Sequence, residues 1–396
     1  MRALLLFLVL AAAAVGVALF ARVNAGYVLF VAPPYRVELS LNAFVLLTLA
    51  GFALVYGVLR LAARIAALPR DVREHRRRAQ DGKVRSKQDA ALVALLEGRY
   101  GKARQFADEA LEVPSAPGLA ALIGARAALE TRDFAAARAF LARPDAQAGS
   151  LAVPRLMLEA EIALEQGQAG EALARLAELK REAGSHTAAL RLELRALNAA
   201  QRPAQIPPVV AELVKRKVYD PAHGDMVRAS AHADALRGLA HDTAGLRDYW
   251  NRLSETDRVH PKVARSAATS YLALGGDREA AEILGKSLER NWDPDLAALY
   301  AECRMPDASR QLETAERWLA AHSQDATLLY ALGRLCERSQ LWGKAQTYYE
   351  ASLALDDHWR AHMALGEMLA RLDRPGEANA HLAAALKLAL RELDGG

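Results

Sequence analysis

The sequence predicts an all-α protein in which two transmembrane helices precede a helical solenoid. Two uncharged apolar stretches open the chain, Ala and Leu dominate the remainder, and a helix–turn–helix pattern recurs about every 34 residues. Ala and Leu favour helix because they lose little side-chain freedom in it. With 396 residues, the chain is also too long for one small domain.

The two apolar stretches cover residues 4–20 and 41–59. A helix needs roughly 20 apolar residues to cross a bilayer, so both are candidate spans. An alternative for the first stretch is a cleaved signal peptide, since it follows Arg2 and ends near small residues. Residues 21–40 are expected to form a short external loop, because Pro33 and Pro34 exclude a continuous helix there.

A dense basic segment follows the second stretch. Residues 60–87 carry a net charge of +7, whereas residues 88–396 carry −5. The belt begins with Arg60, Arg64, Arg70, Arg73, Arg76, Arg77 and Arg78, and continues with Lys83, Arg85 and Lys87. Basic flanks stay cytoplasmic, so both chain ends are predicted in the cytoplasm.

The belt is expected to contact anionic lipid headgroups, with an acidic protein partner as the alternative. No aromatic residue interleaves its arginines, which argues against nucleic-acid binding. The predicted organisation is therefore a membrane anchor (1–59), a basic juxtamembrane segment (60–87) and a solenoid (88–396).

The repeat is marked by alanines that open the second helix of each pair. They are Ala103, Ala137, Ala172, Ala281, Ala345 and Ala378. Neighbouring landmarks are either about one repeat length apart or, across the two long gaps, close to three and two repeat lengths apart. This period indicates tetratricopeptide-like helical hairpins, which must stack to bury their apolar faces.

The clearest copy covers residues 326–359, where Gly333 and Ala345 should let two helices approach closely. In residues 190–260 the prolines are expected to interrupt the helices. These are Pro203, Pro207, Pro208 and Pro221.

By analogy with tetratricopeptide grooves, the first-helix positions that face inward, toward the concave side, in the last two copies predict a partner-binding groove. They are Thr327, Tyr330, Arg334 and Glu337, followed by Arg360, Met363 and Glu367.

No catalytic or metal motif accompanies the repeats. Phosphate loops, dinucleotide fingerprints and nucleophile elbows are absent from the sequence. His358 and His362 are four residues apart but lack the intervening Glu of a zinc helix, and His358 is expected in a turn. His223, His232 and His241 are expected on loops and the surface, and both cysteines, Cys303 and Cys336, as buried apolar residues.

Several segments resemble the proteobacterial HemY family. The external loop contains GYVL at 26–29 and YRVELS at 35–40, and the solenoid contains YWNRL at 249–253 and WDPDL at 292–296. The likeness covers nearly the whole chain. It implies an inner-membrane protein linked to a late stage of haem synthesis, and it carries over no catalytic residue.

Three functions are compatible with this sequence. The first is a non-enzymatic scaffold whose groove holds tetrapyrrole-biosynthesis enzymes at the membrane, where tethering raises their effective concentration. The second is a chaperone or enzyme that binds haem or porphyrin directly, although no cofactor is expected from the motifs. The third is a general envelope-assembly adaptor.

Overall fold

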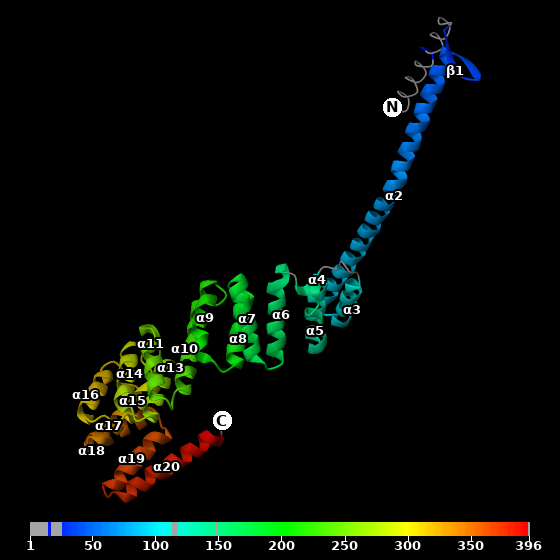
Figure 1. Cartoon of the computed structure of the whole chain (residues 1–396). Coiled ribbons are helices and arrows are strands. Elements are labelled where there is room, and N and C mark those ends of the chain that lie inside the picture. Colours follow the sequence, from blue (N-terminus) through cyan, green and yellow to red (C-terminus); the bar gives the residue numbers. More distant parts are fainter. Residues whose placement is uncertain (1–14, 17–25, 113–117, 148, 395–396) are drawn as a thin grey trace. The chain divides into compact units, whose positions relative to one another are not determined.

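The computed structural model describes residues 15–16, 26–112, 118–147 and 149–394 (Figure 1). The chain divides into two compact units, Met1–Ile123 and Gly124–Gly396. The first predicted span, residues 4–20, lies outside the described residues except for 15–16.

The first unit contains a β-hairpin where the sequence predicts a loop. Strands β1 (Tyr27–Ala32) and β2 (Tyr35–Ser40) pair antiparallel, with Tyr27 opposite Ser40 and Phe30 opposite Val37. The two prolines occupy the turn, so they exclude a helix, as expected, but permit two short strands.

Helix α2 (Leu41–Leu96) follows the hairpin directly and runs for 56 residues. Ser40 caps it by accepting a hydrogen bond from the Ala43 amide. Its first 22 residues, Leu41–Ala62, are long and apolar enough to cross a membrane, which agrees with the second predicted span. The backbone shows no break at either end of the basic segment 60–87, which forms the middle of the same helix.

The C-terminal end of α2 packs against α3 (Tyr100–Leu111) as the first helical hairpin. Ala91, Ala107 and Ile123 are buried together there. Ile123 belongs to α4 (Gly118–Glu130), which contains the boundary between the two units.

The second unit is a succession of helical hairpins. After α4 come α5 (Phe134–Leu141), α6 (Ala152–Glu165), α7 (Ala169–Ala183), α8 (Thr187–Ala199), α9 (Ile206–Lys215), α10 (Pro221–Gly238), α11 (Thr243–Arg252), α12 (Glu255–Arg258), α13 (Pro261–Ala273), α14 (Asp277–Arg290), α15 (Pro294–Glu302), α16 (Ala308–Leu319), α17 (Ala326–Arg338), α18 (Trp342–Leu355), α19 (Trp359–Arg371) and α20 (Pro375–Asp394). Short 3-10 turns, Pro144–Gln147, Gly149–Leu151 and Pro203–Gln205, connect some of them.

The repeat period appears in the backbone as well as in the sequence. In several hairpins a residue in the left-handed region, with φ between 52° and 75°, ends the first helix. In the first four copies they are Gly98, Arg132, Gly167 and Gln201, which follow one another at the period of the landmark alanines. Gln201 marks a regular copy, α8 followed by α9, in the segment whose helices were expected to be irregular.

The prediction that prolines interrupt residues 190–260 is wrong. Pro207 lies in the first turn of α9, and Pro221 opens α10, whose amide at His223 is capped by the Asp220 carboxylate. An amide in the first helical turn has no intrahelical acceptor, so a proline there costs no hydrogen bond. These prolines therefore begin helices.

The landmark alanines are buried, and none of the six exposes more than 4% of its surface. In some of the pairs, close packing depends on a glycine of the first helix. A Cβ atom on Gly333 would lie 2.4 Å from the Tyr349 ring, and one on Gly124 would lie 2.6 Å from Phe140. Glycine and ring are separated by the same stretch of chain in both cases, so these are equivalent contacts in different copies.

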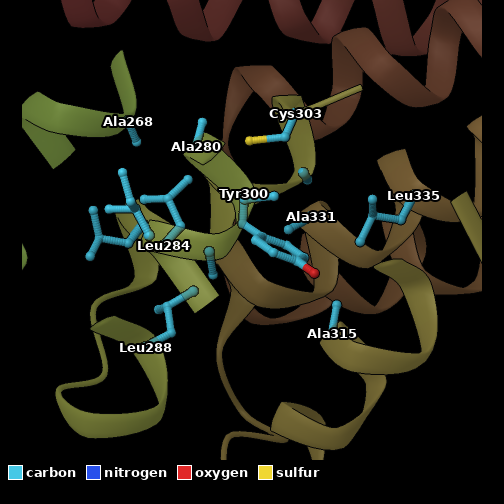
Figure 2. Packing of buried hydrophobic residues seen from close by; sticks show 14 of the residues in the cluster. Ala268, Ala280, Leu284, Leu288, Tyr300, Cys303, Ala315, Ala331 and Leu335 are labelled. Atoms are coloured by element: carbon cyan, nitrogen blue, oxygen red, sulfur yellow. The ribbon is translucent and has the colours of Figure 1, made fainter. Parts of the chain in front are cut away.

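Stacked hairpins share a continuous core from α10 to α20. Figure 2 shows part of it, where Leu284, Tyr300 and Ala331 from successive hairpins pack together. Both cysteines are fully buried, which confirms the prediction for Cys303 and Cys336. Burial raises the pKa of the Cys303 thiol to about 12 and that of Cys336 to about 11.

Candidate partner-binding groove

The first helices of the last five hairpins form a row in which each contacts the next. Helices α10, α13, α15, α17 and α19 make these contacts in order. Because first helix lies against first helix, their outward side chains make one extended surface, here called the first-helix row.

The predicted groove residues lie along this row. On α17, Thr327, Tyr330 and Arg334 are partly exposed at positions i, i+3 and i+7, which share one helix face. On α19 the same spacing joins Arg360, Met363 and Glu367, of which the arginine and the glutamate are exposed. Their binding role stays a prediction.

Glu337 is an exception, because the structure places it in the core rather than on the exposed surface. Its side chain is 6% exposed. The Tyr349 hydroxyl donates to one carboxylate oxygen at 2.9 Å, and Arg371 donates to the other at 2.8 Å. A buried tyrosine hydroxyl needs a partner, and Glu337 supplies it.

This arrangement joins three consecutive helices, α17, α18 and α19, through one carboxylate. Burial, and then the Glu337 charge, raise the pKa of Tyr349. Glu337 is therefore a structural residue, and the expectation that it lines an exposed groove is wrong.

A pocket of about 480 Å³ lies on the same row, nearer its beginning. Helix α10 and helix α13 form its walls, and the turn before α15 closes one side. The lining includes Ala233, Arg237, His260, Pro261, Lys262, Arg265, Ser266, Thr269 and Asp293.

The α13 residues of this pocket repeat the predicted groove pattern. Lys262, Arg265 and Thr269 have the i, i+3, i+7 spacing of Thr327 and its partners, and each lies nearly two repeat lengths before its equivalent. These three α13 residues are missing from the predicted groove because that prediction used only the last two copies of the repeat. Extending the repeat register backwards by two units would have found them.

Three cations face the pocket, and neighbouring groups hold each of them. Arg265 bonds the Asp295 carboxylate at 2.8 Å, and Arg237 bonds Asp234 at 2.8 Å. Lys262 donates from Nζ to the Ser230 hydroxyl at 2.7 Å. An ammonium has three donors, so a ligand carboxylate can bind Lys262 while the serine contact is kept.

His232 is buried, contrary to the expectation of a surface residue. It lies inside α10, and its Nδ1 is 2.9 Å from the Tyr249 hydroxyl. Its Nε2 is 3.8 Å from Asp257, whose carboxylate also accepts from Arg228. Burial lowers the pKa of His232, and the Asp257 charge opposes this only in part.

Two of the C-terminal histidines form a pair across neighbouring helices. His358 precedes α19, as expected, and caps it. His362 instead meets His381 of α20, with 2.8 Å between their Nδ1 atoms, and also contacts Asp357. Among the residues that the structure describes, no three His, Cys, Asp or Glu side chains are grouped to hold a metal ion.

The hairpins and their continuous row define a tetratricopeptide-like helical-repeat protein preceded by a helix of membrane-spanning length. Residues 26–132 match the family model described as "HemY protein N-terminus". The chain is 25% identical to Protein HemY of Escherichia coli K12 over 400 aligned positions, which cover 99% of this chain and 98% of that protein. Protein HemY of Shigella flexneri gives the same values. The chain is therefore similar to HemY proteins over nearly its whole length.

Solved structures with a similar arrangement include MamA, with 17% identity and a TM-score of 0.32 over 41% of this chain and 96% of that one. The Cut9–Hcn1 structure gives 14% identity and the same TM-score over 76% of this chain and 65% of the other. Because these scores are low, the repeat assignment depends on the hairpins and their period.

Proposed function

We propose that this protein is a membrane-anchored, non-enzymatic scaffold that binds other proteins along its first-helix row. The observation that carries this proposal is the repetition of one outward pattern on α13, α17 and α19, with a basic pocket at its α13 end. Similarity to HemY proteins supports a role at a late, protoporphyrin or protohaem, step of haem biosynthesis. The partners would then be tetrapyrrole-biosynthesis enzymes.

The anchor determines where such partners are held. Helix α2 would cross the inner membrane with its basic continuation on the cytoplasmic side, in a multi-pass topology if residues 4–20 also span. Arg60 and the rest of the belt would contact anionic lipids there. Tethering enzymes beside the bilayer raises their mutual effective concentration without any new contact between them.

The pocket indicates the chemistry of at least one bound segment. Lys262, Arg265 and Arg237 favour a carboxylate-bearing peptide, because charged hydrogen bonds to Lys and Arg are among the strongest available to a protein surface. Apolar and aromatic groups farther along the row, including Tyr330 and Met363, would then contact the remainder of an extended partner segment.

Crosslinking the full-length protein in intact membranes, followed by identification of captured proteins, tests the proposal. Lys262→Glu reverses one pocket charge on an exposed first-helix position and should abolish capture of the specific partners. Lys286→Glu is the matched control, because Lys286 is exposed on α14, the second helix of the same hairpin. Equal capture by both variants would refute the groove.

Orientation is tested separately. Protease added outside sealed right-side-out vesicles should leave the helical-repeat domain intact, and its digestion there would show that the domain is not cytoplasmic.

A further inference from the structure

We propose that the β1–β2 hairpin is a lipid-binding element that lies in the membrane interface where α2 begins. One of its faces would rest on the acyl-chain boundary and the other would face water. This inference rests on the proposed membrane anchoring of α2, and it assigns a binding surface to residues 27–40.

The strand register separates the hairpin into two unequal faces. Successive side chains of a strand point to opposite sides, and directly paired residues share a side. One side is apolar throughout apart from a tyrosine hydroxyl, and the other carries both charges of the hairpin. The apolar face consists of Val28, Phe30, Tyr35, Val37 and Leu39, and the opposite face of Tyr27, Leu29, Val31, Arg36, Glu38 and Ser40.

The apolar face is open in the described structure. Phe30 is 48% exposed and Val37 is 50% exposed, although the two are paired across the strands. An apolar side chain that stays exposed to water forgoes the favourable free energy that burial of its surface would give. A two-stranded hairpin is itself only marginally stable in water, so a surface that covers this face would also stabilise the strands.

The covering surface is lipid because the face continues the surface of the proposed span. Leu41, the first residue of α2, donates its amide hydrogen to the Gly26 carbonyl at 2.9 Å, which closes the base of the hairpin. The rings of Phe30 and Phe44 are 5.7 Å apart, so the apolar face lies beside the first turns of the helix. In the most apolar part of Leu41–Ala62, no residue is buried against the rest of the described protein.

The backbone limits how deeply the hairpin can enter. Both strands are edge strands, and unpaired amides and carbonyls are too costly in the hydrocarbon core. In the interface, water and headgroups can satisfy them. Tyr27 is the first residue of β1 and Tyr35 is the first residue of β2. Tyrosine is enriched at the membrane–water interface.

Single-cysteine variants of the full-length protein in vesicles provide the test. Val37→Cys and Glu38→Cys are adjacent on β2 but lie on opposite faces, and an environment-sensitive NBD label on each is exposed to lipids carrying a doxyl quencher. Unsubstituted protein gives the labelling background, since Cys303 and Cys336 are fully buried. Leu49→Cys, at a 62% exposed position within α2, reports whether the span itself contacts lipid.

We expect quenching of the label at position 37 to exceed that at position 38 by at least about twofold, because an interfacial element immerses only its apolar face. Equal quenching at the two positions would overturn the inference, as would blue-shifted but unquenched emission at 37, which would mean protein covers that face. Leu39→Cys and Arg36→Cys are a second opposed pair that must show the same alternation if Val37→Cys disturbs the hairpin. Loss of quenching at position 49 would instead refute the anchoring on which the inference rests.

Discussion

The substitution Gly333→Ala tests whether the hairpins are held together by contacts of helix backbone with a large side chain. A Cβ atom at this position would lie 2.4 and 2.5 Å from two carbons of the Tyr349 ring. Carbon atoms prefer about 3.5–4.0 Å, so the ring would have to move by roughly 1 Å. Tyr349 has no surface exposure, and its hydroxyl is held by Glu337 at 2.9 Å, which restricts that movement.

The magnitude follows from two opposing terms. Overpacking of a filled core costs about 1–3 kcal/mol, whereas replacing Gly by Ala inside a helix recovers about 1 kcal/mol. Gly285→Ala is the matched control, because Gly285 lies within α14 and a Cβ atom there would meet nothing within 4 Å. Both variants gain the same stabilisation from replacing Gly by Ala in a helix. The difference between their unfolding free energies, about 1–3 kcal/mol, is therefore the cost of overpacking against Tyr349.

Hydrogen exchange of the full-length protein in detergent is the suitable assay, because repeat arrays need not unfold in one step. Peptides from α17 and α18 should exchange faster in Gly333→Ala, while peptides from α14 should exchange more slowly in Gly285→Ala. If Gly333→Ala slows hydrogen exchange in α17 as much as Gly285→Ala slows it in α14, then α17 and α18 do not approach as closely as described.

Three further results are expected. Arg371→Met should destabilise the C-terminal hairpins by about 1–3 kcal/mol, because the buried Glu337 carboxylate loses a charged hydrogen bond from the partly exposed Arg371. Arg278→Met removes an ion pair that is exposed on both sides, and it should change stability by less than about 0.5 kcal/mol in the same urea titration. Since burial holds the pKa of His232 below its ordinary value, the unfolded chain takes up a proton there first as pH falls. The free energy of unfolding should therefore decrease as the pH falls below about 6.5. His232→Gln should reduce the decrease between pH 7.5 and 5.5. An equal decrease in the variant and in the unsubstituted protein would contradict this assignment. Finally, burial raises the pKa of the Cys303 thiol to about 12, so neither cysteine should react with maleimide until denaturant is added, and rapid labelling of the folded protein would count against the packed core.

Much of this architecture could be predicted from local sequence. The Ala- and Leu-rich composition indicated helix, and the spacing of alanines such as Ala345 and Ala378 located the hairpins. These features were predictable because each copy repeats the same short-range contacts, and an error in one copy leaves the register of the others unchanged. The second apolar stretch was recognisable for a similar reason, since length and hydropathy suffice to mark a candidate span.

Other features depended on partners distant in sequence or on backbone position. Whether a proline breaks or begins a helix depends on which turn it occupies, and Pro221 lies in the first. The β-hairpin escaped prediction because its two short strands gain their hydrogen bonds only from each other.

The sequence by itself determined the helical class, the repeat period and the position of the candidate span in α2, because these follow from composition and short-range spacing. Tertiary structure alone decided the burial of Glu337 and His232. A charged or polar side chain enters the core only when a neighbouring helix presents a matching group, here the hydroxyls of Tyr349 and Tyr249. No local pattern around either residue specifies that partner.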